Sequence, residues 1–205
     1  MPRKTKKLAD TFVSRSSQLE TTRAKMESLV VSGSINRVDV EQVYAGLYLD
    51  IFTEFEALIE KLFIGLLSGE FYSASYTIQK KVRTKPASMI HDVVYSGKHH
   101  IDWLPYRQWT IPRAEIYLGN GEPFTLLARR QQAILDDYCV IRNAIAHKSD
   151  SANAKFQDLI GSLSLLPHEK TPTGYLRTMP SAGVLQTQYE IAVLELEGIA
   201  KKLCA

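Results

Sequence analysis

The sequence predicts an all-α protein in which long helices are joined by long loops. Apolar residues recur at helical spacing in several long segments. Proline, glycine and helix-capping residues mark the ends of these segments. The 205-residue length and the apolar content of 45% are sufficient for one sizeable core. We therefore expect one helical domain, or one with an appendage.

Two helices are predicted in the N-terminal third of the chain. The first covers about residues 6–31, and Gly33 follows its end. It has a narrow apolar seam of Leu8, Phe12, Leu19, Met26 and Val30, which needs a partner surface. Asp39 and Gln42 have the spacing of a capping box for the second helix, which continues to about Ser68 with a core-facing apolar stripe.

The middle of the chain combines a short helix with a long irregular segment. Pro86 is predicted to open the helix and Gly97 to close it. From Lys98 to Gly121 helical spacing is lost, and we expect an aromatic, basic loop with a short extended piece at residues 115–118. Its aromatic residues could stack RNA bases or form a lid packed on the helices. They include Trp103, Tyr106 and Trp109.

The next helix is predicted to begin at Pro123 and to end near His147. The face expected to point to the core carries Leu127, Ile134, Tyr138, Ile141 and Ile145. The opposite face carries Arg129, Gln132, Asp136, Val140, Asn143 and His147. Asn143 and His147 are four residues apart, a spacing that brings two side chains together on a helix.

The C-terminal part is predicted to contain two more helices. The first covers about residues 152–161, and the last covers about residues 184–203. The long connection between them is rich in proline and glycine, and loops of this length are often functional.

Composition narrows the classes of protein and the kinds of site. No apolar run is long enough for a membrane span, and the N-terminus lacks the apolar region of a signal peptide, so we expect a cytoplasmic protein. Cys139 and Cys204 are too few for a disulfide framework or a zinc site and are expected to be buried. His99 and His100 with Asp102 lack a further ligand at helical spacing, so we predict no metal and no cofactor.

The positive charge of the chain is modest and partly clustered. A net charge of +3 is compatible with a polyanionic partner without requiring one. Lys80, Lys81 and Arg83 form a basic cluster that is either a solvated surface or an RNA contact, and Arg129 is a further candidate for contacting RNA.

The segment from Arg142 to His147 is the most informative stretch of the chain. It places a fixed cation, the Asn143 amide and an imidazole within six residues, just before the breaker run Ser149-Asp150-Ser151. An imidazole can transfer protons near neutral pH, and a guanidinium can stabilise the negative charge of a phosphoryl transition state. The plain alternative is an ordinary helix end, at which the His147 side chain does no more than interact favourably with the helix dipole.

These six residues resemble the R-x4-H signature of the HEPN ribonuclease superfamily, whose second position is commonly Asn, Asp or His. The resemblance implies an antiparallel helical bundle, here residues 37–205, with residues 1–36 as an additional N-terminal helical extension. It also implies a metal-independent endoribonuclease. His147 would act as general base or acid, Arg142 would bind the phosphate, and Asn143 would bind the phosphate or position His147. Asp136, on the same face, could orient the site.

The resemblance further implies a homodimer. Arg142 and His147 are five positions apart and point about 140° from one another on a straight helix, so two copies of the motif would form one composite cleft. RNA is then the expected substrate, and an antitoxin or a phage-defence protein is a possible partner. Two other functions remain open, namely a HEPN-like module that binds nucleotide, RNA or protein without cleavage, and a plain helical interaction protein.

Overall fold

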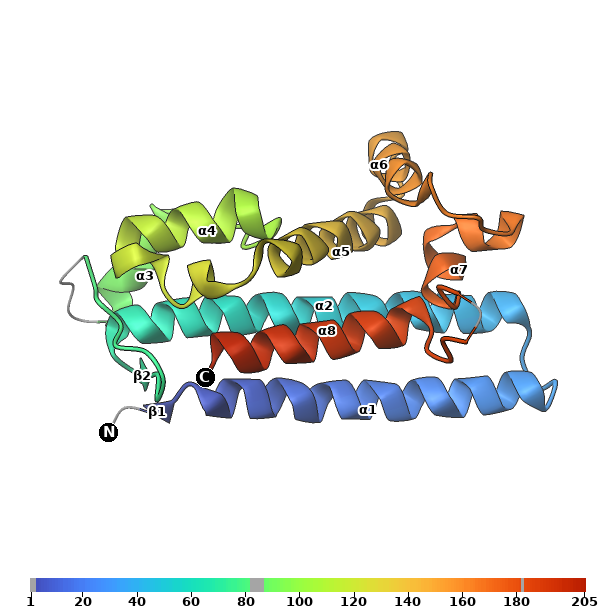
Figure 1. Cartoon of the computed structure of the whole chain (residues 1–205), viewed down its shortest axis with the longest axis horizontal. Helices are drawn as coiled ribbons and strands as arrows, with labels where there is room; N and C mark the ends of the chain where they lie inside the picture. The colour runs from blue at the N-terminus through green and yellow to red at the C-terminus, as the bar shows by residue number, and fades with distance from the viewer. Residues whose placement is uncertain (1–2, 82–86, 182) are drawn as a thin grey trace. The chain divides into compact units, whose positions relative to one another are not determined.

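The all-α prediction is confirmed by a computed structural model that describes residues 3–81, 87–181 and 183–205. Within these residues there are eight α-helices and one small sheet (Figure 1). The helices are α1 (Lys6–Val31), α2 (Arg37–Ser68), α3 (Ala87–Tyr95), α4 (Tyr106–Tyr117), α5 (Arg129–His147), α6 (Asp150–Ile160), α7 (Pro172–Leu176) and α8 (Gln188–Leu203). The sheet consists of the parallel strands β1 (Arg3–Lys4) and β2 (Phe71–Tyr72).

The chain divides into two compact units. The first unit comprises Met1–Phe12, Phe55–Asp136 and Glu197–Ala205, and the second comprises Val13–Glu54 and Asp137–Leu196. Each unit has buried apolar side chains of its own, for example Phe63 and Phe124 in the first and Tyr44 and Tyr189 in the second.

Aromatic side chains fill the core of the first unit. The ring of Phe63 lies 5.0 Å from that of Trp103 and 5.5 Å from that of Phe124, measured between ring centroids. The buried Tyr106 hydroxyl donates to the carbonyl of Phe124 at 2.9 Å. Trp103 and Tyr106 are therefore core residues, whereas Trp109 is 40% exposed.

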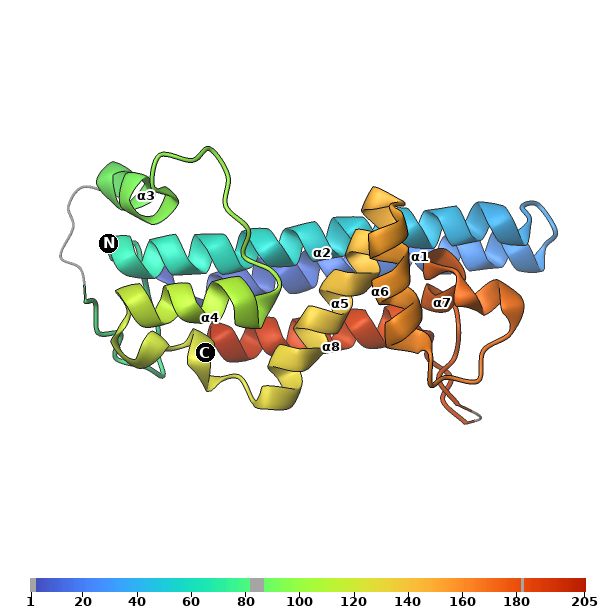
Figure 2. The same cartoon turned by 90° about the horizontal axis from the view of Figure 1, so that it is seen from above.

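The prediction of an irregular loop from Lys98 to Gly121 was wrong in its second half. An extended segment follows α3, but α4 then forms from Tyr106 to Tyr117 (Figure 2). Tyr106, Thr110 and Ala114 are buried at four-residue spacing, so α4 has a core-facing side despite Pro112 within it. The prediction of an extended piece at residues 115–118 was also wrong, because residues 115–117 belong to α4. Leu118 alone pairs with Lys80 in an isolated antiparallel bridge.

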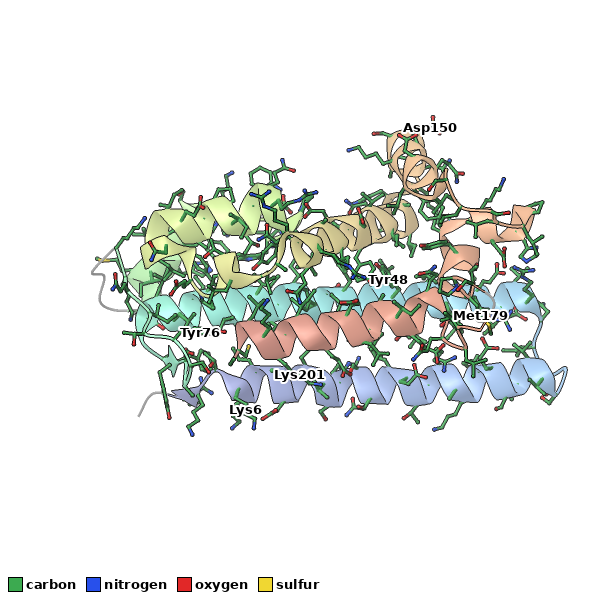
Figure 3. The ribbon with its side chains drawn as sticks, in the orientation of Figure 1. Lys6, Tyr48, Tyr76, Asp150, Met179 and Lys201 are labelled. Carbon is green, nitrogen blue, oxygen red and sulfur yellow. The ribbon has the colours of Figure 1, made fainter. Side chains whose placement is uncertain are left out.

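In the second unit, α1 and α2 are joined by a short turn, both contact α8, and α2 also contacts α5. Arg15 on α1 pairs with Asp50 on α2, with 2.6 Å between nitrogen and oxygen. The ring of Tyr44 packs edge-on against Tyr189 of α8. The Tyr48 hydroxyl donates to the carbonyl of Tyr138 on α5 at 3.0 Å. Figure 3 shows Tyr48 among the helices, while Asp150 projects from the start of α6.

Several predicted helix boundaries shift because polar groups cap the helices elsewhere. The motif helix begins at Arg129 rather than at Pro123, since Gln131 and Gln132 bond the backbone of Ala128 and Leu127 just before it. Short 3-10 helices occur at Gly119–Gly121, Phe124–Leu126 and Pro167–Lys170.

The last helix begins at Gln188 rather than at residue 184. Its start is fixed by a reciprocal capping pair, in which the Thr187 backbone donates to Glu190 at 2.8 Å and the Glu190 backbone donates to Thr187 at 3.3 Å. The predicted loop before it contains α7, whose first turn Thr171 caps by accepting from the Gly174 backbone.

The core-facing side of α5 is rotated relative to the prediction. Leu127, Ile141 and Ile145 are buried as expected. Ile134 and Tyr138 are only half-buried, whereas Leu135 and Cys139 are buried in their place. The predicted opposite face stays out of the core. Its members Arg129, Gln132, Asp136, Val140, Asn143 and His147 are all half-buried or exposed.

Candidate functional site

The three motif residues lie in the last two turns of α5, within the second unit. Arg142 and Asn143 are half-buried, and His147 is exposed. Arg142 Nη1 donates to Asn143 Oδ1 at 3.0 Å, and Asn143 Nδ2 donates to Cys139 Sγ at 3.6 Å. The Asn143 amide is therefore held between a cation and a buried thiol.

His147 is the last residue of α5, and the backbone after it fixes where the helix ends. Lys148 adopts a left-handed conformation with φ of 46°, which breaks the helix. Ser149 then caps α6 by accepting from the Ala152 backbone at 3.2 Å. Figures 1 and 2 both show α6 running across the direction of α5. His147 thus occupies a corner between two helices.

The motif side chains have few partners. In residues 3–81, 87–181 and 183–205, the His147 imidazole forms no hydrogen bond or ion pair, and Arg142 bonds only a neutral amide. A guanidinium without a carboxylate partner can bind a phosphate through its remaining N–H groups. An exposed imidazole can exchange protons with a bound ligand. The arrangement is compatible with recognition of a phosphodiester.

The supporting residue Asp136 is already engaged. It lies in the first unit, where its carboxylate accepts from the side chain and, at 3.3 Å, from the backbone of Arg107. This ion pair connects α5 to α4. The structure therefore gives Asp136 a packing role in its own unit.

The basic residues considered for RNA binding differ in what they contact. Lys80 Nζ donates to the carbonyl of Leu67 at 2.8 Å, and Lys81 Nζ donates to the carbonyl of Glu115 at 2.6 Å. Both carbonyls lie in the last turn of a helix, where backbone acceptors lack helical partners. Arg129 is exposed at the start of α5. Arg83 lies outside the described residues.

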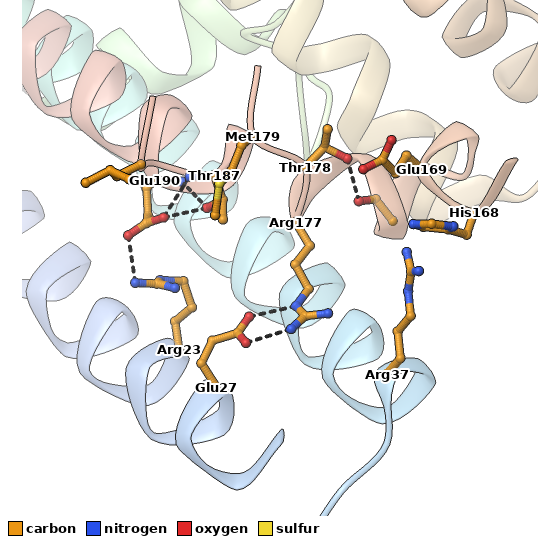
Figure 4. A pocket seen from close by; sticks show the side chains of 12 residues that line it. Arg23, Glu27, Arg37, His168, Glu169, Arg177, Thr178, Met179, Thr187 and Glu190 are labelled. Atoms are coloured by element: carbon orange, nitrogen blue, oxygen red, sulfur yellow. Dashed lines mark hydrogen bonds and ion pairs between the residues drawn. The ribbon is translucent and has the colours of Figure 1, made fainter. Parts of the chain in front are cut away.

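A second polar cluster, which no sequence pattern indicated, connects α1, α2, the segment after α7 and α8. Arg177 binds Glu27 with two parallel hydrogen bonds of 2.7 and 2.8 Å. Tyr44 donates to Glu27 at 2.8 Å and accepts from Arg23 at 3.0 Å. Arg23 also pairs with Glu190 at 2.7 Å (Figure 4). We call Arg23, Glu27, Tyr44, Arg177 and Glu190 the charged network.

Within the charged network, the pKa values of Glu27, Arg177 and Tyr44 depart from their usual values. The Arg177 guanidinium holds the pKa of Glu27 below its usual value, and Glu27 in turn raises the pKa of Arg177. Burial raises the pKa of Tyr44 to about 12, so its hydroxyl stays protonated and donates to Glu27. Arg177 is 150 positions from Glu27 along the chain, which explains why local spacing could not reveal the pair.

The structure also bears on cysteine chemistry and on metal binding. Cys139 and Cys204 are both free and buried, as expected, and burial raises the pKa of the Cys204 thiol to about 12. The described ranges contain no group of three or more His, Cys, Asp or Glu side chains placed to hold a metal ion. In the same ranges, no helix is long and apolar enough to cross a membrane.

Comparisons with family models, curated proteins and solved structures gave no match. The resemblance to the HEPN signature is therefore confined to the motif residues Arg142, Asn143 and His147.

Proposed function

We propose that this protein is a metal-independent endoribonuclease of the HEPN type, acting as a toxin or in phage defence. The observation that supports the proposal best is the state of the motif. Arg142, Asn143 and His147 lie outside the core at one end of α5. In the described part of the chain, no carboxylate pairs with the Arg142 guanidinium or with the His147 imidazole. Such groups remain available for an RNA phosphate.

In the proposed reaction the ribose 2′-hydroxyl attacks the adjacent phosphorus. The 2′-oxygen forms a new bond to phosphorus, and the bond from phosphorus to the 5′-oxygen of the next nucleotide breaks. A His147 imidazole accepts the proton of the 2′-hydroxyl, and an imidazolium returns a proton to the departing 5′-oxygen. The products are a 2′,3′-cyclic phosphate and a 5′-hydroxyl. Arg142 stabilises the charge on the phosphoryl oxygens, and Asn143 holds the guanidinium through the 3.0 Å bond.

The proposal is tested by RNA cleavage with the His147→Ala variant. Loss of one acid or base typically lowers the rate about 10²- to 10⁴-fold. His100→Ala is the matched control, because His100 is also exposed but lies in the other unit. Cleavage should fall by this factor in His147→Ala and persist in His100→Ala. Mass spectrometry should detect cyclic phosphate ends on the RNA cut by the wild type. Wild-type protein that binds RNA without cutting it would instead indicate a binding module.

The active unit in this proposal is a homodimer with a composite site. Because Arg142 and His147 point about 140° apart on one helix, a second copy is needed to complete the site. When Arg142→Ala and His147→Ala subunits are mixed, one of two results is expected. If one intact arginine and one intact histidine are sufficient, the mixed dimer regains part of the activity. If all four groups are needed, the mixed dimer stays inactive, and an excess of either variant inhibits the wild type by forming mixed dimers. A monomer at assay concentration that cleaves RNA at the full rate would contradict the dimer.

A further inference from the structure

A cavity of about 430 Å³ lies beside the charged network in the second unit. Side chains of α1, α2, the segment around α7 and the start of α8 line it (Figure 4). This volume falls within the range of small-molecule sites. None of the motif residues of α5 lines the cavity, so it is a separate site and does not depend on the ribonuclease proposal.

The guanidinium groups of Arg177 and Arg37 line this cavity, and each is bound by a carboxylate along only one edge of the guanidinium plane. Arg177 uses Nε and Nη2 for Glu27, and Arg37 uses Nε for Glu41 at 2.5 Å. Within the described residues, Nη1 of Arg177 and both terminal nitrogens of Arg37 form no hydrogen bond. In Figure 4 the head group of Arg37 points toward the ring of His168. Three hydrogen-bonding groups on three different segments therefore face one cavity.

This set of donors fits a phosphate better than a planar carboxylate. A terminal phosphate has three oxygens directed to different sides, and guanidinium groups bind such oxygens with charge-assisted hydrogen bonds. Glu27, which also lines the cavity, pairs with Arg177, and Glu41, which does not, pairs with Arg37; both carboxylates fix the orientation of their guanidinium group. Because these carboxylates also balance the charge, affinity must come from directed hydrogen bonds, and we expect it to be modest.

The rim of the cavity adds an apolar element. Met179 and Leu185 line the cavity, and they are 55% and 86% exposed. Exposed apolar side chains beside a polar site gain free energy when an apolar part of a ligand covers them. We propose that this cavity binds a small phosphomonoester with an apolar substituent, with the phosphate at Arg37, His168 and Arg177 and the substituent against Met179 and Leu185.

Calorimetric titration of the full chain with phenyl phosphate tests this proposal. Binding at low ionic strength should weaken about tenfold in Arg37→Gln, which loses a charged hydrogen bond, and about threefold in His168→Gln. Both positions lie at the surface of the cavity, so these variants should fold. Arg130→Gln is the matched control, because it removes an exposed arginine outside the cavity. Inorganic phosphate and benzoate should each bind more weakly than phenyl phosphate.

Amide NMR locates the binding. Phenyl phosphate should shift resonances around residues 168–179 and 185–190, which border the cavity. Absence of binding at millimolar concentrations would overturn the proposal, and so would shifts confined to other residues. Equal binding of benzoate would overturn the choice of phosphate, and equal affinity in Arg37→Gln and wild type would remove the assigned donor.

Discussion

The motif on α5 and the charged network differ in how completely their polar groups are satisfied. Arg177 binds both oxygens of one carboxylate, whereas Arg142 bonds one neutral amide oxygen. Tyr44 is bonded on both sides within the network, while the described residues offer no partner to His147. Paired charges stabilise a fold when the geometry is good, and they are costly to separate. Groups with few partners contribute little to stability and can be used for ligands.

The largest effect that this comparison predicts is on catalysis. Under the ribonuclease proposal, Arg142→Ala should lower RNA cleavage by about 10²- to 10³-fold, because one donor to the transition-state charge is lost. Its melting temperature should stay close to that of the wild type, since only a bond to a neutral amide disappears. Arg130→Ala, on the same helix, serves as the control. If Arg142→Ala unfolds the protein, Arg142 stabilises the fold, as the residues of the charged network do.

The next largest effect should be on stability. Arg177→Met leaves the Glu27 carboxylate without its main partner, and we expect a loss of about 1–3 kcal/mol in the free energy of unfolding. Chemical denaturation measures this loss. A double change of Arg177→Met and Glu27→Leu should recover part of it, because no uncompensated charge remains. Equal destabilisation of the single and double variants would show that the pair is not coupled.

The network should also make stability depend on pH. The pKa of Glu27 is lower in the folded state than in the unfolded state, so its contribution is present above the unfolded value of about 4.3 and is lost as pH falls through the folded value. Glu27→Gln should therefore be less stable than the wild type at neutral pH, by no more than about 1 kcal/mol for this partly exposed pair. The difference should shrink below the unfolded pKa. A constant difference would assign the effect to packing.

The smallest effect concerns the lysines that were candidates for RNA binding. Lys80→Met and Lys81→Met each remove a donor to a helix-terminal carbonyl, and each should cost about 0.5–1 kcal/mol of stability. Affinity for RNA should change little in both variants if these ammonium groups serve the fold, which filter binding can measure. A large loss of RNA affinity at unchanged stability would show that these lysines contact RNA.

The sequence predicted the long helices because their apolar residues repeat at helical spacing over many turns. Tyr106, Thr110 and Ala114 also repeat every four residues, but two of them are small or polar, so α4 was missed. The start of α8 depends on the Thr187 and Glu190 pair, a capping signal that could have been recognised. Partners that meet only through folding, such as Glu27 and Arg177, leave no local pattern.

In the candidate site, too, features with a local sequence pattern were predictable and contacts made only by folding were not. Local spacing placed Arg142, Asn143 and His147 in the last two turns of a helix, and the structure has them in those turns. Spacing did not reveal that Asp136 is bound by Arg107, because that contact comes from a different helix. The cavity beside Arg37 and His168 was missed for the same reason.

The corner between α5 and α6 affects how fast His147 can move. Free helix ends fray, and their last side chains then move with the backbone. Here the Ser149 carbonyl accepts from Asn153 at 2.9 Å, and the Ser149 hydroxyl caps the same helix, so only Lys148 and Ser149 separate the end of α5 from the start of α6. We therefore expect His147 to change rotamer within picoseconds to nanoseconds about a steady backbone. Such motion is far faster than the turnover of typical enzymes, so reorientation of this imidazole would not limit the rate of a reaction in which it takes part.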